Sequence, residues 1–170
     1  MAPRPPLPFD PVAEARRHWE EQGWERAAPG MAAVTSVMRA QQIYLARVEA
    51  VLRPLGLTFA RYEVLMLLVF SSRGSMPLGK LSSRLQVHPA SVTNAVDRLE
   101  AQGLLRRLPH QHDRRATLAE LAPEGRALAF KATGLLNQEV FEQPGLAGSE
   151  AEGLFGVLEH LRRQTGDFTG

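Results

Sequence analysis

The chain has 170 residues, of which 44% are hydrophobic, and its 20 basic and 18 acidic side chains leave a net charge of +2. This composition is typical of one folded globular domain and excludes an intrinsically disordered chain. The absence of cysteine excludes disulfides, thiolate zinc sites and cysteine-based catalysis. The longest apolar run, residues 64–70, is too short to span a bilayer, and we expect a cytoplasmic protein.

The N-terminal region is rich in proline. Five of the first eleven residues are proline, and we predict that residues 1–10 form a mobile arm without a signal-peptide core. Residues 11–27 then predict a short helix with Trp19 on its apolar side and Gly23 weakening or ending it. The segment AAPG at 27–30 predicts a break in the chain.

Two longer helices are predicted next. From Met31, apolar residues recur at steps of three, four and seven, which indicates an amphipathic helix. This helix is expected to stop at Arg53, because a residue that precedes proline resists the helical region. Thr58 is the expected N-cap of the following helix, and residues 71–77 are expected to be a loop. The predicted buried face of this second helix consists of Phe59, Tyr62, Leu65, Met66 and Val69.

Two short helices joined by a tight turn follow, one over the segment LGKLSSRL at 78–85 and one from Pro89. Proline suits the first turn of a helix, and Gly103 suits a left-handed helix end. This pattern is typical of a helix-turn-helix, whose second helix meets base edges in the major groove. The alternative is a pair of ordinary surface helices. The expected DNA contacts are Ser91, Thr93 and Asn94 at base edges and Arg98 at a phosphate or a guanine.

Positive charge is concentrated in the centre of the chain. Residues 73–115 carry eight basic and three acidic side chains, a balance of 8 − 3 = +5, so the remainder carries 2 − 5 = −3. Such asymmetry indicates a polyanionic partner for the middle of the chain, although a solvated arginine-rich surface is the alternative.

A hairpin is predicted after the second short helix. Residues 104–109 and 115–121 are its arms, and HQHDRR at 110–115 is its tip. The predicted fold is therefore mainly α, a winged helix-turn-helix with a small two-stranded β-wing. A narrow minor groove attracts arginine, so the tip is expected to touch DNA, with Asp113 holding one of the paired arginines and locking the tip. The tip residues expected to touch DNA are His110, Arg114 and Arg115.

The segment RLEAQGLLRRLPHQHDRRATLAELAPEGRAL resembles the wing region of the MarR family, the multiple-antibiotic-resistance-type regulators. That family shows an Asp-x-Arg followed by Leu-Thr-Pro-x-Gly, and the resemblance extends over roughly residues 31–165. One departure is Ala122, which stands where the family has threonine. Loss of that helix cap costs about 1 kcal/mol and should loosen the junction between the wing and the next helix. The matching residues are Asp113, Arg115, Leu121, Pro123 and Gly125.

The resemblance implies an obligate homodimer formed by the first and last helices. Residues 11–57 and 123–170 would then dimerise, and residues 58–122 would form the DNA-binding lobe. The apolar pattern predicts a helix over 123–141 and a final helix opened by a capping box of Ser149 and Glu152. Two-fold symmetry implies a palindromic double-stranded operator and, as is usual in the family, repression. The inward residues expected in these helices are Leu128, Leu135 and Leu136, then Leu154, Leu158 and Leu161.

The resemblance also implies a small aromatic or anionic effector, bound between the dimer helices and the DNA lobe. The N-terminal extension resembles the extra first helix of the urate-responsive branch, with Trp19 and Glu63 at corresponding places. Phe70 stands where that branch has arginine, which argues against urate. Tyr44 and Tyr62 are further candidates for the cleft wall. The alternative is that Trp19 and both tyrosines only pack the structure.

Two other functions stay open from the residues themselves. His110, His112 and Asp113, with His88 nearby in sequence, are candidates for a metal site of a metal-responsive regulator, but the spacing lacks a catalytic zinc motif. The second open function is that of a helical protein-interaction module without DNA binding. The sequence has no nucleophile elbow, phosphate-cradling glycine loop or carboxylate pair, so we expect no enzyme and no cofactor.

Overall fold

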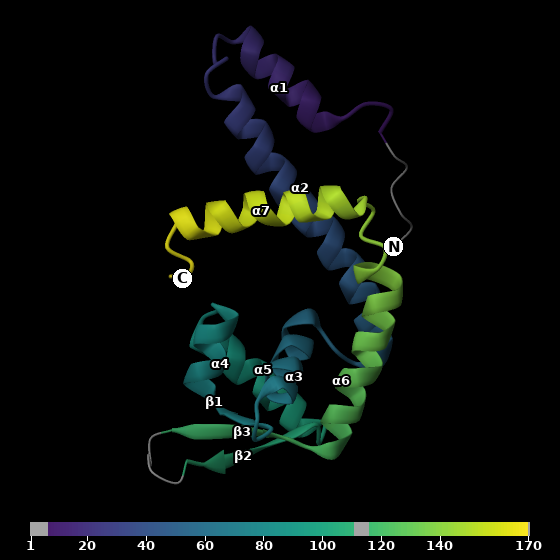
Figure 1. The fold of residues 1–170 in the computed structure, drawn as a ribbon, viewed down its shortest axis with the longest axis vertical. Helices are drawn as coiled ribbons and strands as arrows, with labels where there is room; N and C mark the ends of the chain where they lie inside the picture. The colour runs from purple at the N-terminus through teal and green to yellow at the C-terminus, as the bar shows by residue number, and fades with distance from the viewer. Residues whose placement is uncertain (1–6, 111–115, 170) are drawn as a thin grey trace. The chain divides into compact units, whose positions relative to one another are not determined.

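The computed structural model describes residues 7–110 and 116–169 (Figure 1). The chain divides within its longest helix into two compact units, unit 1 up to Arg47 and unit 2 from Val48. Of the proline-rich arm predicted over residues 1–10, residues 1–6 lie outside the described part. No helix in the described ranges has the length and apolar character needed to cross a membrane.

Unit 1 contains helix α1, Pro11–Glu21, and most of helix α2, Ala28–Leu52. The Asp10 carboxylate caps α1 by accepting a hydrogen bond from the Val12 amide at 2.9 Å. Gly23 follows the helix with a φ of +79°, which confirms its predicted role. The break predicted at residues 27–30 is wrong, because α2 already begins at Ala28. Proline fits the first helical turn, where its missing N–H needs no partner.

Unit 2 holds the remaining elements in the order expected for a winged helix-turn-helix. α2 ends at Leu52, as predicted from the proline at position 54, and helix α3 is capped by the Thr58 hydroxyl. The elements of unit 2 after α2 are η1 (Arg53–Leu55), α3 (Phe59–Phe70), β1 (Ser75–Pro77), α4 (Leu78–Leu85), α5 (Pro89–Ala101), β2 (Leu105–Pro109), β3 (Thr117–Leu121), α6 (Pro123–Leu136), η2 (Asn137–Phe141) and α7 (Gly148–Gln164).

The sheet has three antiparallel strands in the order β1-β3-β2. The predicted hairpin is confirmed, with Leu105 opposite Leu121 and Pro109 opposite Thr117. The predictions of a two-stranded wing and of a loop over residues 71–77 are wrong at Ser75–Pro77. These residues form strand β1, which pairs with the free edge of β3. This pairing gives hydrogen-bond partners to backbone groups that a two-stranded ribbon leaves open.

The core of unit 2 lies between the helices and the sheet, and Figure 1 shows α3, α4 and α5 together on one side of the strands. The buried face predicted for α3 is partly wrong. Val64 and Leu68 are fully buried, whereas Phe59, Met66 and Val69 are only partly buried. The reason is that α3 packs against α5, α6 and β3 rather than against one neighbour, so it buries more than one stripe.

The last two helices differ in detail from the prediction. Leu136 is buried as expected, while Leu128 and Leu135 are only partly buried. The prediction of a capping box formed by Ser149 and Glu152 is wrong. Helix α7 starts two residues earlier, with Ala147 instead of Ser149 at the N-cap, and the Glu150 carboxylate accepts a hydrogen bond from the Ala147 amide at 2.7 Å. Alanine has no side-chain acceptor, so only this half of a capping box exists.

Candidate nucleic-acid interface

A tight turn connects α4 to α5 and sets the direction of the second helix. Gln86 adopts a φ of +54°, and the buried Ser82 hydroxyl donates to the Val87 carbonyl at 2.7 Å. His88 then caps α5, because its Nδ1 accepts a hydrogen bond from the Ala90 amide at 3.2 Å. This bond occupies Nδ1 of His88, so one of its two ring nitrogens serves the start of α5.

Helix α5 has one apolar and one polar face. Val92, Val96 and Leu99 are buried in the core, whereas the four residues expected to contact DNA are all exposed. The Thr93 hydroxyl donates to the Pro89 carbonyl at 3.1 Å, which holds this exposed side chain in one rotamer. Within the described ranges the side chains of Asn94 and Arg98 make no hydrogen bond, so both can turn to a ligand. The four exposed residues are Ser91, Thr93, Asn94 and Arg98.

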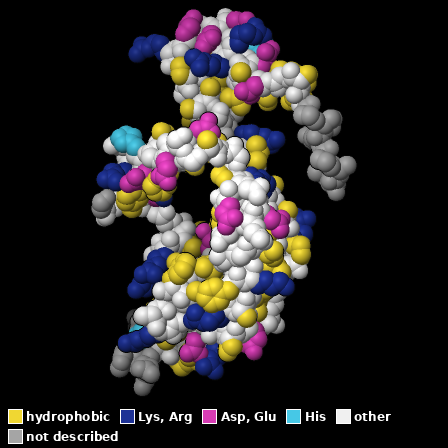
Figure 2. Space-filling view, turned by 45° about the vertical axis from the view of Figure 1, so that its right-hand side comes forward, with side chains coloured by type: hydrophobic (Ala, Val, Ile, Leu, Met, Phe, Trp, Pro, Cys, Tyr) yellow, Lys and Arg dark blue, Asp and Glu magenta, His cyan; other side chains and the backbone are white. Residues whose placement is uncertain are grey.

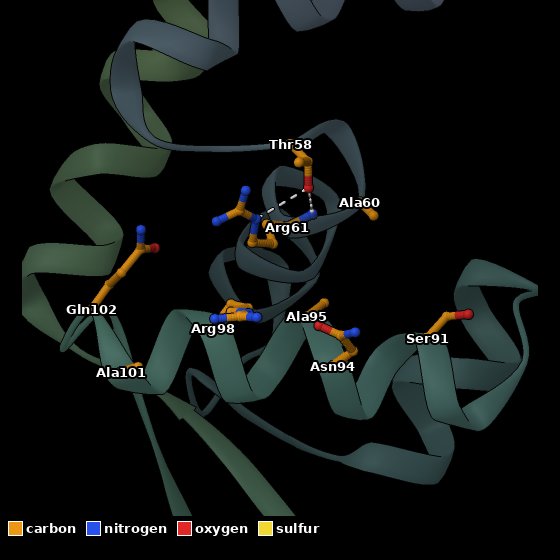
Figure 3. A pocket seen from close by; sticks show the side chains of 9 residues that line it. All are labelled: Thr58, Ala60, Arg61, Ser91, Asn94, Ala95, Arg98, Ala101 and Gln102. Atoms are coloured by element: carbon orange, nitrogen blue, oxygen red, sulfur yellow. Dashed lines mark hydrogen bonds between the residues drawn. The ribbon is translucent and has the colours of Figure 1, made fainter.

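An open hollow of about 710 Å³ lies between the start of α3 and the polar face of α5. We call it the α3–α5 hollow, and Figure 3 shows Asn94 and Arg98 of α5, and Gln102 just after this helix, on the side of α5 that faces Thr58 and Arg61. The amide and Nε of Arg61 both donate to the Thr58 hydroxyl, at 3.4 and 3.2 Å. Within residues 7–110 and 116–169, the terminal guanidinium nitrogens of Arg61 make no hydrogen bond and no ion pair. Two guanidinium groups from different helices therefore line one solvent-open hollow, as a phosphate-binding surface requires.

Sequence reasoning missed Arg61 and Gln102 as members of this site. Gln102 follows α5 and donates through Nε2 to the Gly56 carbonyl at 3.5 Å. The one available signal for Arg61 was its place three residues after the cap Thr58, which puts it in the first turn of α3. Its proximity to α5 depends on the packing of α3 on α5, which periodicity does not reveal.

The wing is tied to α5 by Arg107 of β2. Its guanidinium contacts the carboxylates of Asp97 at 2.6 Å and Glu100 at 2.7 Å, and it also donates to the Thr93 carbonyl at 3.4 Å. Burial alone would lower the pKa of Arg107, but the hydrogen bonds to both carboxylates outweigh burial, and the pKa is raised above its ordinary value. Arg106 pairs with Glu120 on the neighbouring strand. The two acidic residues of α5 are thus neutralised on the side of the helix that faces the wing.

Most of the predicted wing tip lies outside the described residues. This holds for His112, Asp113, Arg114 and Arg115, so their expected contacts stay predictions. His110 is described, and its amide donates to the Ala116 carbonyl at 3.1 Å, which extends the hairpin by one step. In the ranges 7–110 and 116–169, no three side chains of the metal-binding types gather in one place. His112 and Asp113 lie outside these ranges, so a metal site that uses them stays a prediction.

A second hollow, of about 450 Å³, lies beside α3 and the end of α4. We call it the α3–α4 hollow; it contains the predicted effector residues Tyr62 and Glu63, together with Arg84, which sequence reasoning assigned only to the basic segment. The Tyr62 hydroxyl shares a hydrogen bond of 3.0 Å with the Thr133 hydroxyl of α6. Burial raises the pKa of the Glu63 carboxyl above its usual range. The lining consists of Phe59, Tyr62, Glu63, Met66, Leu67, Phe70, Arg84, Leu85, Thr133 and Phe141.

The other two predicted effector residues belong to unit 1. Trp19 packs edge-on against Trp24, with ring centroids 5.2 Å apart and an interplanar angle of 76°. This contact closes the turn between α1 and α2 and supports the alternative of a packing role for Trp19. Tyr44 is half-buried on α2.

Comparison with known proteins agrees with this geometry. Residues 57–117, which contain the helix-turn-helix and most of the wing, match the model of the MarR family. The chain is similar to a MarR family transcriptional regulator from Streptomyces coelicolor, with 46% identity over 84% of this chain and 99% of that one and a TM-score of 0.77. The regulator BpsR of Bordetella bronchiseptica is 26% identical over 76% of this chain and 97% of that one, with a TM-score of 0.67.

A curated relative gives the same assignment over a shorter stretch. The uncharacterized HTH-type transcriptional regulator YhbI of Bacillus subtilis is 38% identical over 84 residues. That match covers 49% of this chain and 53% of YhbI, so the chain spans about half the length of this curated relative. The fold, the position of the family match and the near-complete coverage of the Streptomyces regulator lead to one conclusion: the chain belongs to the MarR family of transcriptional regulators.

Proposed function

We propose that the chain is a sequence-specific DNA-binding regulator of transcription that works as a homodimer in the cytoplasm and has no enzymatic activity of its own. In this proposal it represses its target and is released by a small aromatic or anionic effector. The observation that carries the proposal is the exposed polar face of α5 next to the α3–α5 hollow, where, within the described residues, the terminal guanidinium nitrogens of Arg61 and the guanidinium of Arg98 make no hydrogen bond.

The proposed DNA contacts follow from the two faces of α5. Ser91, Thr93 and Asn94 near the helix start would meet base edges in the major groove. Arg98 and Arg61 would hold the flanking phosphates, because guanidinium groups bind phosphate oxygens in a fork geometry. The wing would reach the neighbouring minor groove with His110, Arg114 and Arg115, while Asp113 would hold the tip.

The proposed dimer is supported by apolar side chains that lie at the surface. Val34, Met38 and Ile43 of α2 are exposed, as are Phe155 and Val157 of α7. Figure 2 shows hydrophobic side chains at the surface, interspersed with charged ones. Exposed apolar surface of this extent marks interfaces, and the helices of residues 11–57 and 123–170 would supply it. A two-fold dimer would read a palindromic operator.

The proposed effector site is the α3–α4 hollow. The DNA binding of Bordetella bronchiseptica BpsR is regulated by 6-hydroxynicotinic acid, so a small-molecule effector has a precedent among similar proteins. In this chain an apolar hollow with few polar groups has the character of a small-ligand site, and Tyr62 and Glu63 line it. The roles expected of Trp19 and Tyr44 in effector binding stay predictions from the sequence.

A DNA-binding experiment tests the proposal. The purified chain is titrated with duplexes from its own upstream region and with a scrambled duplex, at salt concentrations from ~50 to ~200 mM. We expect tighter binding to one upstream duplex and a steep loss of affinity with salt, because phosphate contacts release counterions. Equal, weak binding to every duplex would contradict the proposal, and binding that a chelator abolishes would favour a metal-responsive regulator.

Two variants locate the contacts within that assay. Asn94→Ala should cost about 1–3 kcal/mol and relax discrimination at one position of each half-site, if Asn94 reads a base edge. An equal loss on scrambled DNA would show that Asn94 contacts only the backbone. Arg115→Ala should weaken operator binding about tenfold or more with the dimer intact, and unchanged binding would remove the wing tip from the interface.

A further inference from the structure

The segment that follows α7 turns back on the helix. Gly166 has a φ of +76°, and its amide donates to the Arg163 carbonyl at 3.2 Å, while the Asp167 amide donates to the Arg162 carbonyl at 2.9 Å. These two bonds form a Schellman motif, in which a left-handed glycine ends a helix and reverses the chain. We call residues 165–169 the tail.

Side chains fix the tail against the last turn of α7. The guanidinium carbons of Arg162 and Arg163 lie 5.6 and 5.5 Å from the centre of the Phe168 ring, which is within the range of a cation–π contact. The Asp167 carboxylate pairs with Arg162 at 3.9 Å. The tail is therefore held to α7 by its backbone and by its side chains.

The tail contacts the turn of the helix-turn-helix through Gln86. The Gln86 side chain donates through Nε2 to the Asp167 carbonyl at 2.6 Å, across 81 positions of the sequence. Gln86 has a φ of +54°, a left-handed conformation that glycine adopts at less cost and that favours glycine in turns between two helices. The contact with the tail gives a reason for a side chain at this position, because glycine could not make it.

The same turn determines where α5 begins. On its buried side, the Ser82 hydroxyl donates to the Val87 carbonyl at 2.7 Å, and the Val87 amide donates to the Ser82 carbonyl at 3.3 Å. On its exposed side, the tail holds Gln86, which lies two residues before the cap His88. The turn is thus bonded to α4 and to the tail at adjacent residues, and α5 follows directly.

We propose that Gln86 and the tail form a latch that joins α7 to the turn before α5 and thereby fixes the position of α5 relative to α7. Gln86 is then a positioning residue, which acts on DNA through α5. This inference rests on the proposed function, in which α7 lies in the dimer interface and both copies of α5 read one palindromic operator. With α7 fixed in the interface, the two latches fix the separation of the two α5 helices, so the dimer distinguishes operators by the spacing of their half-sites.

Operators with altered spacing test the latch. The half-sites of the bound upstream duplex are mapped by footprinting, and one base pair is inserted or removed between them. Each base pair changes the separation by about 3.4 Å and the relative rotation by about a tenth of a turn. We expect the unmodified chain to bind the natural spacing about tenfold or more tightly than either altered one, an effect as large as that of one mismatched base pair. Fluorescence anisotropy measures the affinities.

Two variants break the latch from opposite sides. Gln86→Gly removes the donor but suits the left-handed turn, so the Tm should be unchanged or higher. A chain that stops at Gly166 lacks the acceptor and the Phe168 ring, and a chain that stops at Phe168 is its matched control. Both latch variants should lose most of the preference for the natural spacing, and the control should keep it. Combining the two changes should add nothing, because both break the same contact.

Hydrogen exchange tests the contact in the absence of DNA. We expect the backbone amides of residues 83–90 to exchange faster in the chain that stops at Gly166 than in the chain that stops at Phe168. The physical reason is that the latch opposes local opening of the turn. A loss of spacing preference in Gln86→Gly at an unchanged or higher Tm is not expected of a residue that only stabilises the fold.

The outcomes separate the latch from the proposed function. If the unmodified chain binds its operator without preferring the natural spacing, or if both latch variants keep that preference, the latch is wrong and the proposed function stands. A uniform gain of affinity in the latch variants also contradicts it, because the contact would then hold α5 away from DNA. If the unmodified chain binds no upstream duplex, the proposed function fails. Faster exchange at residues 83–90 in the chain that stops at Gly166 then supports the latch, and equal exchange overturns it.

Discussion

At the scale of single residues, the junction between the wing and α6 lacks a helix cap. Ala122 is the N-cap of α6, with extended backbone angles and no side-chain hydrogen bond, which confirms the expectation from the sequence. Ala122→Thr should restore a hydroxyl that accepts from the free amides of the first turn. We expect the free energy of unfolding to rise by about 0.5–2 kcal/mol, measured by urea denaturation.

A matched control separates the cap from the side chain's bulk. Ala122→Val has the shape of threonine without the hydroxyl, so it should not stabilise the protein. Equal stability of the threonine and valine variants would show that capping does not limit this junction.

Gly125 is required by a close approach of two backbone segments. A Cβ at this position would lie 1.9 Å from the carbonyl oxygen of Leu104, and neither backbone can move without disturbing the sheet or α6. Gly125→Ala should therefore destabilise the fold by about 1–3 kcal/mol or more. Gly134→Ala in the same helix meets no atom within 4 Å and should instead stabilise it by up to about 1 kcal/mol. Thermal unfolding of both variants tests whether their effects on stability have opposite signs.

The partly buried carboxyl of Glu63 makes stability depend on pH. Because its pKa is raised in the folded protein, its contribution to stability is fully present below the ordinary pKa of about 4.5 and is lost as the pH rises through the folded pKa. Glu63→Gln removes this loss. We expect the variant to have a higher Tm than the wild type at pH 7 and an equal Tm near pH 4. A difference that stays the same at both values would contradict burial as the cause.

At the scale of elements, Arg107 joins the wing to the recognition helix and neutralises its two acidic residues. Arg107→Met should release the carboxylates of Asp97 and Glu100, which then repel the phosphates that α5 approaches. We expect operator affinity to fall about tenfold, with a smaller change in stability because the ion pairs are partly exposed. Fluorescence anisotropy with a labelled operator measures the loss.

The double variant Arg107→Met with Glu100→Gln tests the electrostatic part of this explanation. Removing one released carboxylate should restore part of the lost affinity. If it restores none, Arg107 acts by holding the wing in place and not by neutralising α5.

The elements that sequence reasoning found are those specified locally. The apolar stripe of α5, its proline start and Gly103 at its end all lie within one segment, as do the two arms of the wing. Strand β1 was missed because it has three residues and forms only by pairing with β3. The start of α2 was misplaced because proline and glycine also fit a first turn. The α3–α5 hollow could not be predicted from the sequence, because only tertiary packing brings Arg61 and Arg98 to the same hollow.

At the scale of the whole molecule, the small net charge conceals an uneven distribution of charged and apolar side chains along the chain. The central segment has an excess of positive charge, and Arg107 keeps the acidic residues of α5 from opposing it. The surrounding helices instead expose apolar side chains. A monomer would leave that surface in water, and one DNA-binding lobe alone would hold few base pairs. Association of two chains through these helices would bury the apolar surface and would bring two DNA-binding lobes to one duplex.

The last prediction tests this association on α7. Leu154, Val157 and Leu161 recur on one stripe of the helix, and Val157 has a relative exposure of 68% in the single chain. Val157→Asp should place an unpaired carboxylate in the dimer interface, which costs several kcal/mol, and sedimentation at micromolar concentration should then show monomers. Gln164→Asp adds the same charge at an exposed polar position of α7 and should leave the dimer intact. A dimeric Val157→Asp variant would mean that this stripe faces solvent and that the chain pairs through other helices.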